Sequence, residues 1–499
     1  MEFCEKWCLI SLIREKLIGL FKQSFVYTIG SLASPIMGIF MVPIYTRVFA
    51  PEDYGVIDLI QITIVFASVT LIMGMDNATG RYYLEKDNEK DKRVIAATSL
   101  FFRAAVLFIA SVLLVLFSDK ISQLLFRSGR QSGFLILACI AIPFDHCFTL
   151  CINMLRYEYR SVSYTLLSVG KLIGKISLTV LLVVFLKWGI AGVFTASLIS
   201  SIFFLIAVLI VTRKYFSFSF SLTRLKELLL YGLPLVPYGL TVYLIQNCSR
   251  YFLLHYRSLE EVGLYAVGAK LATLISFVFI GVGAALDPYI YSGYREEETR
   301  TVYLKTTNYL VAASVVAVLA LSLFTREILL VFTTRKYIGA VGITPLLAAY
   351  TAFFYLGLQM SLGIHIAKKT IYFTVISIIT AVVTIILNIV LVPLYGMTGA
   401  AVATLAGSIV WCVLLVYQSQ VYYRIEYKYG AFMIMLVVTA VIILISTWFF
   451  MDVNLLNIVI KMGLIIVVAA LTYYAGLIGK SELDYGKSII KKLFFKGNL

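Results

Sequence analysis

Runs of about 20 consecutive apolar residues recur along the whole chain and constrain its fold more than any other feature. A helix of about 20 residues is long enough to cross the roughly 30 Å hydrocarbon core of a bilayer. In lipid, backbone polar groups must be satisfied within the chain itself, so such runs form helices. The strands of a membrane barrel are about 10 residues long and alternate in polarity, a pattern that these runs lack. We therefore predict an all-α, polytopic membrane protein.

We predict about fourteen transmembrane helices, joined by loops too short to hold a soluble domain. The fourteen spans cover residues 24–48, 54–77, 94–118, 132–155, 164–186, 189–212, 228–254, 262–287, 304–325, 341–366, 370–392, 398–420, 430–451 and 455–478. Residues 1–22 have mixed charge and no small-residue cleavage site, which argues against a signal peptide. We predict that they form an amphipathic segment on the cytoplasmic membrane surface.

The formal net charge of +16 is explained by the orientation of the chain and does not require nucleic acid as a partner. With both termini in the cytoplasm, 27 of the 42 Lys and Arg residues fall in or beside cytoplasmic segments, 10 fall on the external side and 5 lie inside spans. This asymmetry follows the positive-inside rule. We therefore expect a multi-pass protein of the bacterial inner membrane with both termini in the cytoplasm.

The two halves of the chain resemble each other at an offset near 207 residues. The matched pairs are Arg47 with Arg250, Gly55 with Gly263, Gly74 with Gly281, Gly189 with Gly396 and Gly192 with Gly399. Each repeat holds six spans, so the two halves have the same orientation. Parallel repeats with a substrate site between them are typical of transporters that work by alternating access.

The repeat predicts four parts of the chain. The amphipathic segment is residues 1–22, the N-lobe of six helices is residues 23–215, the C-lobe of six helices is residues 216–422, and residues 423–499 hold two further helices and a basic cytoplasmic tail.

Several basic side chains lie inside or at the ends of the predicted spans, where charge is costly and usually faces a wet interior. Lys171 and Lys175 share a helix face at roughly 10 and 16 Å from the cytoplasmic end of their span. The cationic candidates for substrate binding are Arg47, Arg81, Arg103, Lys171, Lys175, Arg250 and Lys270. One interpretation is a cationic cavity for a phosphate or diphosphate. The alternative is snorkelling, or structural ion pairs with Asp58, Asp76, Asp145 or Glu260.

Asp145 and His146 lie well inside the fourth predicted span. A carboxylate beside an imidazole at this depth is a candidate for coupling to H⁺ or Na⁺. The alternative is that Asp145 neutralises a lysine of the next span. Cys147 and Cys151 lie nearby, but a metal site would need more ligands at tetrahedral spacing, so we expect neither a metal nor a cofactor.

Two segments resemble the signatures of a known family. They are Pro43-Ile-Tyr-Thr-Arg47-Val-Phe-Ala-Pro51-Glu-Asp-Tyr54-Gly55, and Gly74-Met-Asp-Asn-Ala78-Thr-Gly-Arg81-Tyr82-Tyr83. Together with the two turns that begin at Gly189 and Gly396, they resemble the polysaccharide transporters, the Wzx-type oligosaccharide flippases. The resemblance covers most of the chain. The chain departs from the family at Thr79-Gly80, where larger apolar residues are commoner.

The resemblance implies a fold of two six-helix lobes around a central cavity, as in the multidrug/oligosaccharidyl-lipid/polysaccharide superfamily. It implies transport of a polyprenyl-diphosphate-linked oligosaccharide, such as an undecaprenyl-linked repeat unit, from the cytoplasmic to the outer leaflet, driven by an ion gradient or the membrane potential. Assembly enzymes such as a polysaccharide polymerase would be partners, and membrane lipids surround the protein. Arg47 and Arg81 carry over from the family signatures.

Three other functions remain open from the sequence. A multidrug or cation antiporter of the same superfamily would favour acidic cavity residues, whereas embedded bases outnumber mid-span acids here. A lipid II flippase fits the opening signature less well. A membrane glycosyltransferase or polymerase would need catalytic external loops, and the external loops are short. We therefore expect a transporter and no enzyme activity.

Overall fold

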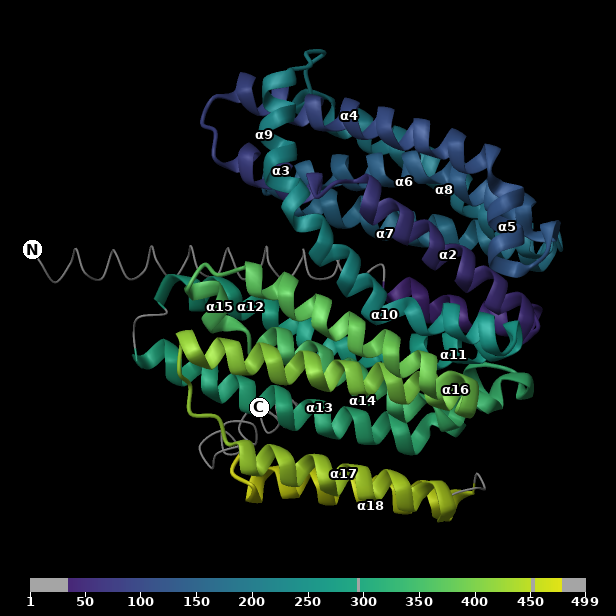
Figure 1. The fold of residues 1–499 in the computed structure, drawn as a ribbon, viewed down its shortest axis with the longest axis vertical. Coiled ribbons are helices and arrows are strands. Elements are labelled where there is room, and N and C mark those ends of the chain that lie inside the picture. The colour runs from purple at the N-terminus through teal and green to yellow at the C-terminus, as the bar shows by residue number, and fades with distance from the viewer. Residues whose placement is uncertain (1–34, 294–296, 450–453, 478–499) are drawn as a thin grey trace, which may run out of the picture. The chain divides into compact units, whose positions relative to one another are not determined.

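The protein is all-α, as the sequence predicts. The computed structural model describes residues 35–293, 297–449 and 454–477, and in these ranges helices are joined by short connections without any strand (Figure 1). The amphipathic segment predicted for residues 1–22 and the last part of the basic tail lie outside the described residues.

The chain is a multi-pass membrane protein. Eleven helices within the described ranges are long and apolar enough to cross a bilayer, and two shorter apolar helices cover Pro35–Val48 and Tyr429–Leu444. The longest helix, Ile371–Tyr422, contains two predicted spans, which are separated by a break at Gly396. Within the described residues, each of the fourteen predicted spans overlaps an apolar helix, while the number of actual crossings stays a prediction.

The chain divides into two compact units. Unit 1 comprises Met1–Val267 and Ser377–Ala400, and unit 2 comprises Gly268–Ile376 and Ala401–Leu499. Two helices, α11 (Leu259–Ala272) and α16 (Ile371–Tyr422), contribute to both units. The boundary between lobes that the repeat places after residue 215 stays a prediction.

Unit 1 is organised around α6. Its helices are α2 (Pro51–Leu71), α3 (Met75–Leu84), α4 (Glu89–Leu116), α5 (Ser118–Phe126), α6 (Ser132–Tyr157), α7 (Ser161–Thr179), α8 (Gly189–Thr212), α9 (Leu222–Gly232) and α10 (Val236–Tyr256). Helix α6 packs against α4 and α8, α7 packs on α8, and α3 packs on α4 and α9 (Figure 1). Side-chain caps begin two of them: Asn88 accepts from the Lys90 N–H before α4, and Ser221 accepts from the Arg224 N–H before α9.

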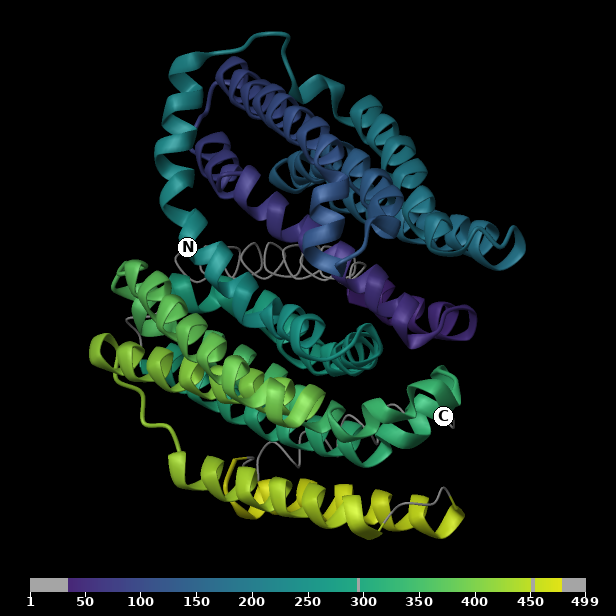
Figure 2. The same cartoon turned by 45° about the vertical axis from the view of Figure 1, so that its right-hand side comes forward.

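Unit 2 is organised around the long helix α13. Its helices are α12 (Ser276–Gly293), α13 (Glu297–Phe332), α14 (Thr344–Gln359), α15 (Leu362–Ile366), α17 (Tyr429–Phe449) and α18 (Leu455–Tyr474). Helix α13 contacts α12, α14, α17 and α18, and α17 and α18 run side by side (Figure 2). A buried ion pair between Lys461 of α18 and Glu327 of α13 ties the C-terminal helix pair to this unit.

The turn predicted at Gly396 is a sharp break within α16. Gly396 has φ +56°, and Gly189 at the matching repeat position has φ +58°, a region in which glycine is favoured.

A charged side chain caps the chain on each side of the break at Gly396. Arg257 donates to the carbonyls of Val392 and Pro393 before it, and Glu261 accepts from the Met397 N–H after it at 2.8 Å. Each charge has the sign that the adjacent helix end favours.

Two glycines matched by the sequence repeat touch each other in unit 1. A Cβ added to Gly55 of α2 would lie 2.3 Å from the Leu259 carbonyl oxygen, and one added to Gly263 of α11 would lie 1.9 Å from the Pro51 carbonyl oxygen. The absence of a side chain at both positions allows the two helices to approach closely.

Replacing Gly263 with alanine is expected to destabilise unit 1. The new methyl would overlap backbone atoms of α2, which cannot move aside as a side-chain end can, and overpacking costs about 1–3 kcal/mol. Gly133→Ala is the matched control, because nothing lies within 4 Å of a Cβ at that position. Thermal unfolding in detergent should give a lower Tm for Gly263→Ala and an unchanged or raised Tm for the control. Equal melting of Gly263→Ala and wild type would refute the close contact.

Candidate functional site

The charged residues inside unit 1 gather around α6. Asp145 of α6 pairs with Lys171 of α7, with 2.7 Å between Oδ1 and Nζ, and the Ser201 hydroxyl of α8 donates to the same oxygen at 3.1 Å. The Lys171 ammonium also lies 3.9 Å from the centre of the Phe148 ring, a favourable cation–π position. Its side chain is only 16% exposed, whereas that of Asp145 is 47% exposed. The carboxylate therefore covers a cation that lies deeper in the protein.

A second ion pair joins α4 to α3 and contacts α6 at His146, the residue after Asp145. Arg103 of α4 donates to Asp76 of α3 at 2.6 Å and to the backbone carbonyl of His146 at 3.2 Å. The side chain of Arg103 is 1% exposed and that of Asp76 is 39% exposed, so the carboxylate is again the more exposed residue of the pair. Because Asp145 and His146 are consecutive, the two ion pairs form one network that joins α3, α4, α6, α7 and α8.

Lys175 adds a third cation to this network. It is half-buried, one helical turn beyond Lys171, and its charge also acts on Asp145. We call Asp76, Arg103, Asp145, Lys171 and Lys175 the α6 cluster. The α6 cluster thus holds three cations and two carboxylates. The helix that carries Lys175 continues into a π-helical segment, Val180–Phe185, a distortion often found at functional sites.

Arg250 takes part in a separate, fully buried ion pair. Its guanidinium lies 2.7 Å from Asp58 of α2, and both side chains are buried. Arg250 also donates to Asn247 at 2.9 Å. Two more bonds join α2 and α10 nearby, since the Tyr243 hydroxyl donates to the Ile62 carbonyl and the Thr63 and Tyr251 hydroxyls bond each other. This cation therefore fastens two helices of unit 1 together.

The remaining predicted cations lie elsewhere. Arg47 is exposed at the end of the helix Pro35–Val48. Arg81 is exposed on α3, where it pairs with Glu85 at 3.0 Å and lies 4.7 Å from the centre of the Tyr231 ring. Lys270 belongs to the part of α11 in unit 2.

The geometry thus brings together Arg103, Lys171, Lys175, Asp145 and His146. The ion pairs weighed as an alternative for Arg103, Arg250 and Asp145 are present, with Asp76, Asp58 and Lys171 as their respective partners. The use of these residues in a cationic cavity stays a prediction. No group of three or more residues that could hold a metal occurs in the ranges that the structure describes.

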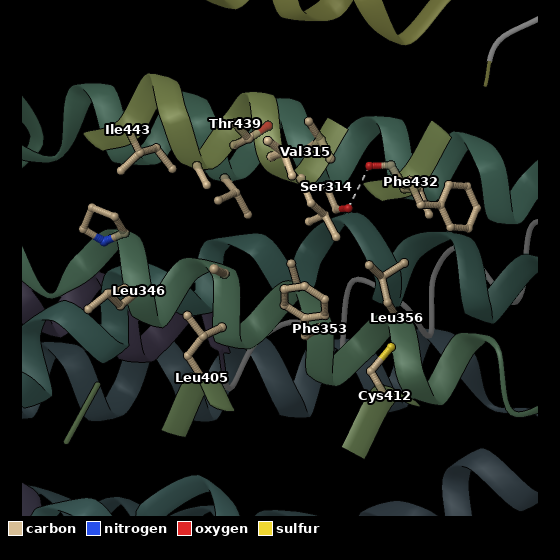
Figure 3. A pocket seen from close by; sticks show the side chains of 18 of the residues that line it. Ser314, Val315, Leu346, Phe353, Leu356, Leu405, Cys412, Phe432, Thr439 and Ile443 are labelled. Carbon is tan, nitrogen blue, oxygen red and sulfur yellow. Dashed lines mark hydrogen bonds between the residues drawn. The ribbon is translucent and has the colours of Figure 1, made fainter. Parts of the chain in front are cut away.

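Unit 2 holds an apolar cavity of about 540 Å³ that the sequence does not reveal (Figure 3). Helices α13, α14, α17 and the second part of α16 line it, with Val315, Phe353, Leu405 and Ile443 among its walls. Hydroxyl groups at the wall are satisfied locally, as that of Ser314 is by the Val311 carbonyl at 2.9 Å. A cavity of this size and polarity suits a hydrocarbon ligand.

Comparison with known proteins identifies relatives for the sequence. The family model described as "Polysaccharide biosynthesis protein" matches residues 20–293. A protein of the Lsg locus of Haemophilus influenzae is 22% identical over 280 residues, which cover 56% of this chain and 67% of that protein. A second membrane protein of the same organism is 23% identical over 287 residues, with the same coverage of both chains.

Solved structures with the same fold are membrane transporters. The lipid II flippase MurJ in an inward closed conformation superposes with a TM-score of 0.72 at 15% identity, over 94% of this chain and 100% of that one. An inward-facing multidrug resistance transporter of the MATE family, from the MOP superfamily, gives a TM-score of 0.62 at 18% identity, over 79% of this chain and 94% of that one. At these identities the likeness establishes the fold.

Proposed function

Because the chain belongs to the polysaccharide biosynthesis protein family, we propose that it is a flippase for a lipid-linked oligosaccharide. It moves a polyprenyl-diphosphate-linked oligosaccharide, such as an undecaprenyl-linked repeat unit of a surface polysaccharide, from the cytoplasmic to the outer leaflet of a bacterial inner membrane. It does so by alternating access and without catalysing a reaction. Both termini lie in the cytoplasm, and enzymes that polymerise the exported glycan are its partners.

The α6 cluster is the observation that carries this proposal. Its cations Arg103 and Lys171 are more deeply buried than the carboxylates with which they pair. Both cations belong to helices that are long and apolar enough to cross a membrane. The carboxylates hold the cations charged in the absence of substrate, since an unpaired buried charge is costly. A diphosphate offers the same kind of acceptor oxygens with more charge, so it can compete for the N–H donors of Arg103, Lys171 and Lys175. The three cations of the cluster suit an anionic ligand better than a cationic one.

The apolar cavity of unit 2, taken by itself, suits a hydrocarbon chain such as that of a polyprenyl lipid. Arg47, Arg81 and Lys270 are proposed as further cationic contacts of the diphosphate. For Arg250 the buried contact with Asp58 favours a structural role instead.

Asp145 and His146 are proposed to couple transport to an ion gradient. Asp145 is the more exposed residue of its ion pair with Lys171. When a substrate phosphate pairs with Lys171 instead, the Asp145 carboxylate becomes free to bind H⁺ or Na⁺.

Asp145→Asn is expected to remove the dependence of glycan export on the ion gradient, because an amide can neither take up a proton nor balance Na⁺. Export would be measured in cells with and without an uncoupler, and at low and high Na⁺. Glu85→Gln, which changes an exposed carboxylate outside the cluster, is the control. An ion response unchanged from wild type would make Asp145 a structural counter-charge only.

A multidrug or cation antiporter is the second candidate, because Asp76 and Asp145 are open carboxylates and a MATE transporter shares the fold. A lipid II flippase is the third, since MurJ also shares the fold.

One genetic experiment separates these candidates. In a strain lacking the gene, the flippase proposal predicts loss of a surface glycan and accumulation of its lipid-linked intermediate, both reversed by the wild-type gene. Normal glycan with increased sensitivity to cationic drugs would instead establish the antiporter. Rescue of a strain depleted of its lipid II flippase would establish the third candidate.

A further inference from the structure

A second, polar pocket lies in unit 1 beside the α6 cluster. It has a volume of about 350 Å³ and occupies the place where α3 meets the turn between α6 and α7. Its lining includes Asp76, Asn77, Gly80, Arg156, Tyr157 and Tyr159. We call it the α3 pocket.

The wall of the α3 pocket depends on Gly80. Gly80 has no side chain, and Tyr157 fills the space: a Cβ at position 80 would lie 2.6 Å from the Tyr157 hydroxyl oxygen. Thr79 turns inward and bonds the Ser99 hydroxyl at 2.7 Å. A larger residue at position 80 would displace Tyr157, so Gly80 allows Tyr157 to take its place in the pocket wall.

The chemistry of the α3 pocket matches a sugar ring. A pyranose presents hydroxyl groups that donate and accept hydrogen bonds, and an apolar C–H face that packs on aromatic rings. The pocket supplies an amide, a guanidinium, a carboxylate and two phenol rings. The side chains of Asn77 and Arg156 are exposed, and neither makes a hydrogen bond or ion pair with another residue in the described part of the chain. Both are therefore available to a ligand.

Tyr159 supports the same assignment. It is exposed and has φ +53°, a left-handed conformation that is uncommon for a residue with an aromatic side chain. This conformation ends α6, because the Arg160 N–H donates to the Leu155 carbonyl at 2.8 Å in a common form of helix C-terminus. Here the turn between α6 and α7 holds an aromatic ring at the rim of the pocket.

Asp76 belongs to both sites. Its Oδ1 pairs with Arg103 in the α6 cluster, and the residue also lines the α3 pocket. A ligand with a diphosphate next to a sugar would therefore occupy neighbouring sites. Resting on the proposed function, we propose that the α3 pocket binds a sugar ring of the lipid-linked glycan, and that Asn77, Gly80 and Arg156 determine which glycan is transported.

The test compares two substrates in proteoliposomes that contain the full-length protein. One is the polyprenyl-diphosphate-linked repeat unit extracted from the native host, and the other is the same polyprenyl diphosphate without sugar. Asn77→Ala, Arg156→Ala and Gly80→Leu are each expected to slow transfer of the glycan-bearing lipid about tenfold, since each removes a hydrogen bond or displaces Tyr157 from the pocket wall. Transfer of the sugar-free lipid should be unchanged. Arg160→Ala, an exposed arginine outside the pocket, is the control and should leave both rates unchanged.

Two results would overturn the sugar site: transfer of the glycan-bearing lipid at the wild-type rate by all three variants, or equal slowing of both lipids. Asn77→Ala and Arg156→Ala change exposed side chains and keep the test valid if Gly80→Leu does not fold. Failure of the proposed function looks different, because the wild-type protein itself would then not move the glycan-bearing lipid.

Discussion

Lys175→Met should reduce glycan export about tenfold or more while leaving the protein folded in the membrane. The substitution keeps most of the length of the side chain but removes one of the three positive charges of the α6 cluster. A charge-assisted hydrogen bond to a phosphate is worth about 1.5–3 kcal/mol, which corresponds to roughly ten- to a hundredfold in binding. Asp145 keeps its ion pair with Lys171. Surface glycan in the complemented strain is the measurement.

Two variants control this result. Lys175→Arg keeps the charge and should retain most of the export, since Arg also binds phosphate. Lys120→Met removes an exposed lysine of α5, outside the cluster, and should behave as wild type. Export by Lys175→Met at the wild-type level, with equal amounts of protein in the membrane, would contradict a role for the α6 cluster in substrate binding.

Arg250→Ala should cause the largest loss of stability of any single change considered. It leaves the buried Asp58 carboxylate without its partner, and breaking a buried ion pair in this way costs about 3–5 kcal/mol. Arg47→Ala is the matched control, because Arg47 occupies the equivalent repeat position but is exposed. Thermal unfolding in detergent and the amount of protein in the membrane should fall sharply for Arg250→Ala and change little for Arg47→Ala.

The double variant Asp58→Leu with Arg250→Met separates structure from transport. Replacing both partners by apolar residues of similar size is often close to neutral for stability. We therefore expect the double variant to recover folding and export together. Recovery of folding without export would mean that Arg250 also contacts the substrate. Equal stability of Arg250→Ala and Arg47→Ala would contradict the buried ion pair itself.

The sequence predicts the helices well because each depends on local properties. Within the described residues every predicted span overlaps an apolar helix, and Gly189 and Gly396 lie at turns with positive φ, as their positions between apolar runs indicate. Lys171 and Asp145 are on consecutive spans, which are expected to pack together, so their ion pair could be foreseen as one of two alternatives.

Contacts between helices distant in the chain could not be predicted in the same way. Apolar runs reveal neither which helices pack together nor how each is rotated. Arg47 and Arg250 look equivalent in the repeat, yet one is exposed and the other buried against Asp58. The apolar cavity of unit 2 and the α3 pocket depend on the shapes left between packed side chains. Neither of them is predicted from the sequence.

Transfer of the native lipid-linked oligosaccharide across a bilayer by the purified protein tests the central claim most directly. Proteoliposomes would be loaded with this lipid, and its exposure to an added glycan-modifying enzyme would be followed over time. The proposed function predicts rapid exposure of the inner-leaflet pool with wild-type protein and slow exposure with Lys175→Met. Exposure no faster with folded wild-type protein than with empty liposomes, under an imposed ion gradient and membrane potential, would contradict it.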